Sequence, residues 1–128
     1  MKRPLIAISL AAVLSCSGPT ELEQLRERRA ELKADILALI GDPLCDSVEE
    51  CRYIAFGDKP CGGPWSYLVY SISQTDSVQL KSLVDEYWWV DHEYNWWTGG
   101  FSLCDLAPIP VLGRRDGRCV DLRQRPIS

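Results

Sequence analysis

The sequence has few of the residues from which metal centres are built. It contains a single histidine, and none of its six cysteines forms a Cys-x-x-Cys pair. A structural zinc site normally takes four cysteine or histidine ligands at short paired spacings. We therefore expect no metal site, and no pattern in the sequence indicates a cofactor.

The chain also has little continuous apolar sequence. Its N-terminal apolar run, residues 5–14, is about half of the ~20 residues that a membrane-spanning helix needs. Lys2 and Arg3 precede this run and small residues follow it, which is the pattern of a secretory signal peptide. We predict that residues 1–15 are removed on export.

The end of this segment, Val13-Leu14-Ser15-Cys16, resembles the lipobox of bacterial lipoproteins. The resemblance implies that Cys16 becomes the N-terminus and carries acyl chains, with residues 16–19 as a tether. Each buried methylene adds about 0.8 kcal/mol, so several chains anchor a protein stably. The prediction is a protein held in the lipid bilayer and facing the periplasm or the cell exterior. The alternative is a secreted protein in which Cys16 is discarded or is a spare thiol.

Basic residues are in deficit. The chain has 14 Lys and Arg against 18 Asp and Glu, a formal charge of −4, and loss of Lys2 and Arg3 lowers this to −6. Nucleic-acid binding needs clustered cations. Arg26, Arg28 and Arg29 do cluster, but glutamates interleave with them, as on a solvated helix face. No nucleic-acid partner is expected.

Five cysteines follow Cys16, and export places them in an oxidising compartment. Disulfides are therefore expected, but an odd number allows at most two bonds and leaves one thiol over. The five are Cys45, Cys51, Cys61, Cys104 and Cys119.

A first helix is predicted over residues 20–41. Thr20 and Glu23 form a capping box, and Gly41 ends the helix. The highly charged first half, to about Glu31, is expected to project as a stalk, and the second half to dock on the core. Alternatively, the helix pairs with another copy or a partner. The apolar stripe consists of Leu22, Leu25, Leu32, Ile36 and Leu39.

The remaining residues, 42–128, form the predicted cysteine-containing domain. The fold class is α+β: a small antiparallel sheet packed with two main helices and stabilised by disulfides. Residues 65–72 are apolar on both faces, so this strand is expected to be central in the sheet. Strands are predicted at 53–56, 65–72 and 101–106, a second helix at 76–97, and a hairpin over 111–122 around Asp116-Gly117.

The second helix carries an unusual number of aromatic side chains. A helical wheel places Trp89 and Trp96 nearly opposite the core face and Trp88 and Trp97 on its flanks. Either the first helix covers these indoles, or they form an exposed surface for a protein, a glycan or a membrane. The core face consists of Leu80, Leu83, Val84, Tyr87, Val90 and Tyr94.

Asp91 also falls on the core face. A carboxylate there must accept hydrogen bonds, for example from a tyrosine hydroxyl, or lie at the rim. A catalytic reading would combine Cys61 as nucleophile with His92 as base. The wheel places His92 outside the core arc, and an exported cysteine is more often oxidised than catalytic. We expect no enzyme activity and name no catalytic residue.

The stretch CRYIAFGDKPCGGPWSYLVYS at residues 51–71 is followed by LVDEY in the second helix and by DGRC near the end. Together these motifs resemble a family of small bacterial lipoproteins and secreted proteins. The resemblance covers residues 45–119 and implies location and fold, but no particular activity.

The family pattern also includes a Cys-x5-Cys pair, here Cys45 and Cys51. Its C-terminal hairpin often carries two cysteines, and Arg114 stands here at the first of them. This departure implies that Cys119 has lost its local partner and is the free thiol. The disulfide candidates are then Cys45, Cys51, Cys61 and Cys104. The family has more polar residues at the positions of Trp88, Trp89, Trp96 and Trp97.

We therefore predict a lipid-anchored, non-catalytic binding or interaction protein of the cell envelope, with an envelope protein or a glycan as partner. One alternative is a protease-inhibitor-like module that presents the turn Lys59-Pro60-Cys61-Gly62. Another is a structural envelope protein that pairs through its first helix. The third is an enzyme with an unrecognised site.

Overall fold

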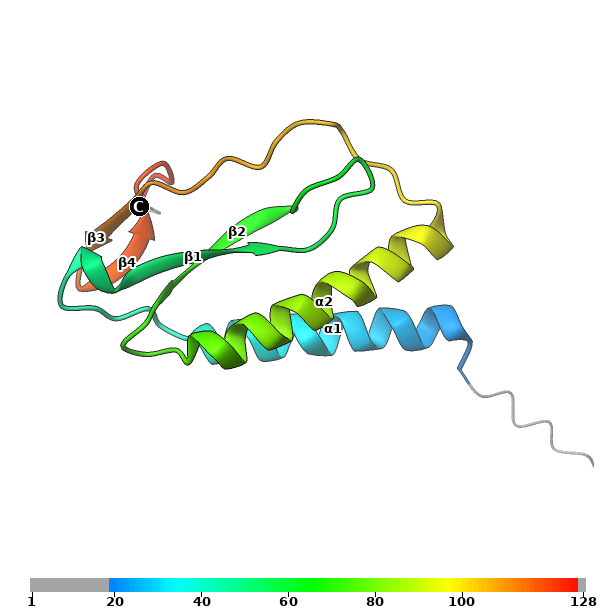
Figure 1. Cartoon of the computed structure of the whole chain (residues 1–128), viewed down its shortest axis with the longest axis horizontal. Helices are drawn as coiled ribbons and strands as arrows, with labels where there is room; N and C mark the ends of the chain where they lie inside the picture. Colours follow the sequence, from blue (N-terminus) through cyan, green and yellow to red (C-terminus); the bar gives the residue numbers. More distant parts are fainter. Residues whose placement is uncertain (1–18, 127–128) are drawn as a thin grey trace, which may run out of the picture.

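The computed structural model describes residues 19–126, which form an α+β fold. Two long helices, α1 (Glu21–Ile40) and α2 (Ser77–Thr98), lie side by side and run in opposite directions, with the strands on one side of them (Figure 1). None of the helices described has the length and apolar character needed to cross a bilayer. The predicted signal peptide and Cys16 lie outside the described residues.

The ends of both helices are fixed by local signals, as predicted. The Thr20 hydroxyl accepts from the Glu23 amide, and the Thr20 amide donates to the Glu23 carboxylate. Asp76 caps α2 by accepting from the amides of its first turn. Gly99 ends α2 in the left-handed region, at φ 62°, where a side chain would be unfavourable.

The strands form two separate two-stranded antiparallel sheets within the described residues. A single 3₁₀ turn, η1 (Val48–Glu50), leads into β1 (Cys51–Phe56), which pairs with β2 (Ser66–Ser71). The second sheet is the hairpin of β3 (Leu112–Arg115) and β4 (Arg118–Asp121). Its turn is the predicted one, with Asp116 and Gly117 both at positive φ.

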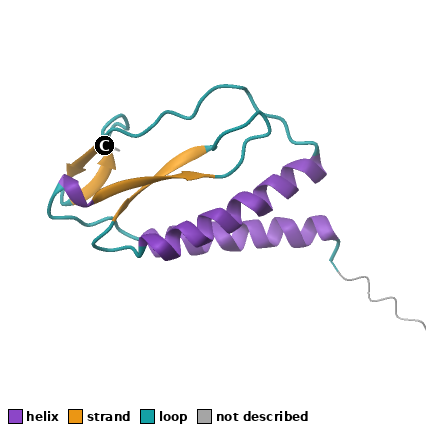
Figure 2. Cartoon of the chain, viewed as in Figure 1, coloured by secondary structure: helices purple, strands orange, loops and turns teal. Residues whose placement is uncertain are grey.

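Two strand predictions are wrong. The strand at 65–72 is not central, because β2 pairs with β1 alone in the described structure. Its two apolar faces instead meet different clusters: Leu68 and Tyr70 join the helical core, and Val69 packs against the cysteines. Residues 101–106 form no strand and belong to a long loop that runs from α2 to β3 (Figure 2). An apolar segment forms a strand only when it can hydrogen-bond to a neighbouring strand, and composition alone does not show whether such a neighbour is present.

The main core lies between the two helices and the β1–β2 sheet. The ring of Phe56 on β1 stacks on that of Tyr87 on α2, with centroids 4.3 Å apart. Leu32, Ile36 and Leu80 are completely buried between them. The core face predicted for α2 is confirmed, since its buried residues are Leu80, Val84, Tyr87 and Asp91.

The first half of α1 does not project as a stalk. It lies along the second half of α2, where Arg28 pairs with Glu86 and Arg29 pairs with Asp91. The guanidinium of Arg29 also lies over the ring of Tyr94, 4.7 Å from its centroid. The charges on this half of the helix thus bind it to α2 instead of only solvating it.

The packing of the core predicts that two leucines of α1 contribute very differently to the free energy of unfolding. Leu32→Ala is expected to lower the free energy of unfolding by about 2–5 kcal/mol, because it opens a cavity at a fully buried position. Leu37→Ala is the control and should cost about 1 kcal/mol or less, because 48% of its surface is already exposed. Urea unfolding of the two variants measures the difference, and equal losses would contradict the packing of α1.

Candidate functional site

The most distinctive surface of the molecule lies on α2. Trp89, Trp96 and Trp97 are 63%, 82% and 59% exposed, while Trp88 is half-buried. We call the first three the aromatic surface. Helix α1 packs on a different face of α2, through Asp91 and Tyr94. Of the two interpretations left open by the sequence, the exposed surface is the one observed.

The loop that follows α2 continues this apolar exposure. Phe101, Leu103 and Leu106 are each at least 70% exposed, and the loop begins directly after the helix. Single exposed apolar side chains are ordinary, but a group of large ones on adjoining segments indicates a surface that contacts something.

Two shallow grooves flank the aromatic surface. Trp96 lines one of about 370 Å³ together with Pro60, His92 and Asn95. Trp97 lines another of about 400 Å³ with residues of the first turns of α1, among them Glu21 and Leu25. The aromatic surface therefore reaches from the corner after β1 to the beginning of α1.

Aromatic neighbours hold part of this surface in place. The ring of Trp88 stacks on that of His92 at 5.2 Å and meets Trp89 edge-on at 4.8 Å. Both contacts join residues of one helix, so they do not depend on distant segments. Rings held in this way lose little conformational freedom when a partner covers them.

A buried carboxylate lies on the core face of α2, on the side of the helix away from Trp89 and Trp96. Asp91 is completely buried and accepts three hydrogen bonds: from Arg29 Nε at 2.5 Å, from the Asp58 amide at 2.8 Å and from Trp65 Nε1 at 2.9 Å. The prediction of hydrogen bonding is confirmed, but the suggested tyrosine donor is wrong. The partners come from α1 and from the chain segment between β1 and β2, whose approach no local sequence pattern reveals.

The surroundings of Asp91 leave little space. Gly57 has φ 81°, and a Cβ there would lie 2.5 Å from the Trp65 ring. Burial alone would lower the pKa of the Arg29 guanidinium, but the charge of Asp91, its hydrogen bond and the smaller effects of Tyr87 and Tyr94 together outweigh burial and raise this pKa. The pair is therefore a fixed ionic link between α1, α2 and the segment after β1.

Cys61 is a disulfide cysteine, as predicted, because its sulfur is bonded to Cys104; it cannot serve as the nucleophile of the catalytic reading. His92 is half-exposed, as predicted, and its Nδ1 lies 2.8 Å from a carboxylate oxygen of Asp58. This histidine and carboxylate are close together, but the thiol that they were to activate is oxidised.

The turn at Lys59 does not present that side chain to a protease. Lys59 is 6% exposed, and its Nζ donates to the backbone and side-chain oxygens of Asp105 at 2.6 and 2.9 Å. The hydrogen bond and the charge of Lys59 lower the pKa of the Asp105 carboxyl. Together with the Cys61–Cys104 disulfide, this contact attaches the long loop to the corner before β2.

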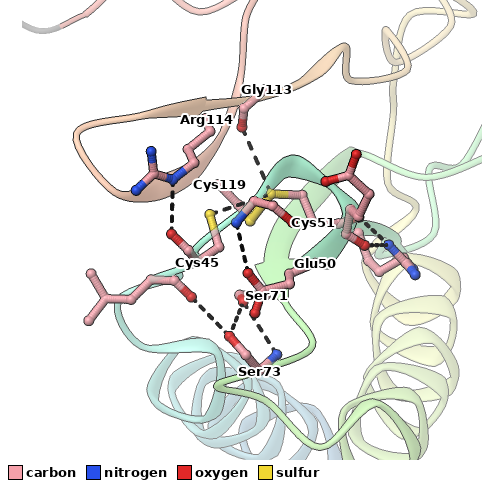
Figure 3. Close-up of a disulfide and its surroundings, with 12 residues drawn as sticks. Cys45, Glu50, Cys51, Ser71, Ser73, Gly113, Arg114 and Cys119 are labelled. Atoms are coloured by element: carbon pink, nitrogen blue, oxygen red, sulfur yellow. Dashed lines mark hydrogen bonds between the residues drawn. A yellow bond between two sulfur atoms is a disulfide. The ribbon is translucent and has the colours of Figure 1, made fainter.

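The predicted free thiol is also wrong. Cys119 forms a disulfide with Cys51, and Cys45 is the cysteine left free among residues 19–126 (Figure 3). The β3–β4 hairpin carries Cys119 to the start of β1. Arg114 on β3 donates from Nε to the Cys45 carbonyl, at 2.9 Å. Cys45 therefore lies beside the disulfide without joining it.

A further cavity, of about 580 Å³, lies between α1, β2 and the β3–β4 hairpin. Leu37, Tyr67 and Val69 form part of its walls, and Arg118 contributes a positive charge. That guanidinium is engaged by both oxygens of Asp42, at 2.6 and 2.8 Å. The other charged residues that line the cavity are Arg115, Arg125, Asp116 and Asp121. It therefore has apolar walls and charges of both signs, a combination that indicates no specific ligand.

The buried ion pair predicts that two neighbouring arginines of α1 contribute differently to the stability of the fold. Arg29→Met removes the only charged partner that the structure gives Asp91 among the described residues. Because the carboxylate is left buried and uncompensated, the loss should be about 3 kcal/mol. Arg28→Met is the control and should have little effect, since its pair with Glu86 is exposed. Chemical denaturation of the two variants tests this, and equal stabilities would refute it.

A scan against protein-family models, a search of curated proteins and a search of solved structures each found no match to this chain. The family resemblance of residues 45–119 therefore remains a prediction.

Proposed function

We propose that this protein is a lipid-anchored, non-catalytic binding protein of the cell envelope, and that the aromatic surface of α2 is its binding face. The observation that carries the proposal is the exposure of Trp89, Trp96 and Trp97 on one helix. Large aromatic side chains supply most of the energy at binding surfaces, and leaving three in water is unfavourable unless a partner covers them.

Export is supported by the cysteines. Four of the five that follow Cys16 form the disulfides Cys51–Cys119 and Cys61–Cys104, and such bonds persist in oxidising compartments. The lipobox-like end of the N-terminal segment supports anchoring through acyl chains on Cys16. Both features support a location at a membrane surface outside the cytoplasm.

A binding role is favoured over catalysis by the chemistry of the candidate groups. Cys61 is committed to a disulfide, Asp91 is sealed beneath the surface by three donors, and Lys59 is neutralised by Asp105. What the aromatic surface presents to the solvent is mainly apolar ring area. That surface suits adhesion to a partner better than proton transfer.

The anchor is tested by labelling growing cells with an alkyne analogue of a fatty acid. The wild-type protein should carry the label and fractionate with membranes. Cys16→Ser should abolish both, because the acceptor thiol is lost. An unlabelled mature wild-type protein would contradict the anchor.

The binding face is tested with a photoreactive amino acid placed at position 96 in intact cells. We expect crosslinks to an envelope component at position 96. The control is position 78, where Val78 is 82% exposed at the opposite end of the same helix. Equal crosslinking at both positions would show that the aromatic surface is not a binding face. Trp89→Ala with Trp96→Ala should leave the melting temperature nearly unchanged, since both side chains are exposed.

A further inference from the structure

The aromatic surface lies at the end of the molecule from which the chain leads back to Cys16. Helix α1 begins at Glu21, five residues after Cys16. At ~3.4 Å per residue, even a fully extended segment spans no more than about 17 Å. An acyl anchor on Cys16 therefore keeps the first turn of α1 close to the bilayer.

The last turns of α2 share this end of the molecule. Trp97 lines a groove with Glu21, Gln24 and Leu25 of the first turns of α1. In Figure 1 the C-terminal end of α2 and the start of the long loop lie at the same end as the beginning of α1. The tryptophans that close α2 are thus within reach of the surface to which the tether is fixed.

We propose that this end of the molecule rests on the bilayer, with Trp96, Trp97 and Phe101 in the interfacial layer. The inference rests on the proposed lipid anchor and names the partner of the aromatic surface. Tryptophan suits the interface because its ring is apolar while its N–H stays hydrated. The rings of Trp96 and Phe101 are more than four-fifths exposed, so they are free to enter it.

Charge indicates how the contact is made. The charged residues that line the groove with Trp97 are Glu21, Glu93 and Arg28, of which Arg28 is paired with Glu86. The chain after residue 15 has a formal charge of −6. We therefore expect burial of the aromatic rings, and not attraction to anionic lipids, to drive the contact with the bilayer. We expect binding to zwitterionic vesicles with little dependence on salt.

The tether favours the bilayer over a protein or glycan as occupant. A short covalent link makes contact with the membrane intramolecular, so its effective concentration is high. A soluble partner would have to compete with that contact for the same rings. The bilayer is thus the partner that the length of the tether selects.

The test uses the acylated protein in phosphatidylcholine vesicles that contain brominated lipid, which quenches tryptophan fluorescence on contact. The wild type should be quenched, and Trp96→Phe with Trp97→Phe should lose most of the quenching. The matched control is Trp89→Phe, because Trp89 is about as exposed as Trp97. Trp89 lies eight residues, about 12 Å, nearer the N-terminal end of α2 and so farther from the proposed bilayer contact. This variant should keep the quenching.

Equal quenching in the control and the double variant would overturn the inference, as would no quenching of the wild type. Because the acylated protein still floats with the vesicles in these cases, the anchor itself would stand. A crosslink from position 96 to a protein or glycan instead of lipid would likewise overturn the inference but keep the binding face. A protein that carries no acyl chain would instead defeat the proposed function.

A separate observation concerns the free thiol. The sulfurs of Cys45, Cys51 and Cys119 all lie within 4.8 Å of one another, and all three residues are buried. Figure 3 shows the Cys45 sulfur directed at the Cys51–Cys119 bond, 3.8 Å from the Cys51 sulfur. A thiol at contact distance from a disulfide is placed for thiol–disulfide exchange.

We infer that Cys45 exchanges with this disulfide. The Cys45 thiol releases a proton, and its thiolate attacks the Cys51 sulfur. The Cys45–Cys51 bond forms, the Cys51–Cys119 bond breaks, and Cys119 leaves as a thiolate that takes up a proton. The number of disulfides is unchanged, so the step needs no external oxidant or reductant.

The exchange would alter what the disulfide connects. Cys51–Cys119 joins β1 to β4 across 68 positions, whereas Cys45–Cys51 would close a loop of six. A bond that closes the longer loop constrains the unfolded chain more, so the observed pairing should stabilise the fold against unfolding more than the other isomer would. The folded structure has this pairing, and we expect it to predominate. In the other isomer the β3–β4 hairpin keeps only noncovalent links, such as the hydrogen bond from the Cys119 amide to the Pro43 carbonyl.

The exchange is tested by mapping the free thiol of the purified mature protein without added thiol. Samples held at increasing pH are quenched in acid, denatured, alkylated and analysed by peptide mass spectrometry. Most label should fall on Cys45, with a fraction on Cys119 that appears faster as the pH rises, because the thiolate is the attacking species. Cys45→Ser should leave Cys119 unlabelled.

Cys119→Ser supplies a second measurement, since this variant should form the Cys45–Cys51 bond. Label confined to Cys45 at every pH overturns the exchange. A Cys119→Ser protein in which Cys45 and Cys51 both stay free thiols overturns it as well.

Discussion

The buried ion pair of Arg29 and Asp91 is the contact on which the arrangement of the helices depends. A fully buried carboxylate is tolerated only when it is paired and hydrogen-bonded, and Asp91 obtains its partners from α1 and from the segment between β1 and β2. The pair therefore requires α1 to lie against α2 along its charged first half. It also brings the corner after β1, with Trp65, onto the same helix.

This docking decides which side of α2 remains open. With α1 held on the side of Asp91 and Tyr94, Trp89 and Trp96 are left exposed on the other side of α2, and Trp97 lies at the edge of the contact with α1. The Cys61–Cys104 disulfide then fixes the start of the long loop near the same end. Exposure of the aromatic surface is thus a consequence of satisfying one buried charge, and it places large rings beside the beginning of the tethered helix.

Much of the local structure could be predicted because its causes are local. The capping box at Thr20, the Asp76 cap and the Asp116-Gly117 turn each act over a few residues, and all three are present. The pairing of Cys119 could not be predicted, because it depends on where a hairpin lands across the fold. The strand prediction for residues 101–106 failed for a similar reason: their composition suits a strand, but in the described structure they pair with none.

The sequence by itself determined the two helices with their ends, the α+β class and the core face of α2, since these follow from periodicity and from neighbouring residues. Only the tertiary structure decided which cysteine stays free, what neutralises Asp91 and whether the tryptophans face water. Each of these depends on groups far apart in the chain, as with Arg29 and Asp91 or Cys51 and Cys119. Such pairs are chosen by the packing of the whole domain, on which the local sequence has no bearing.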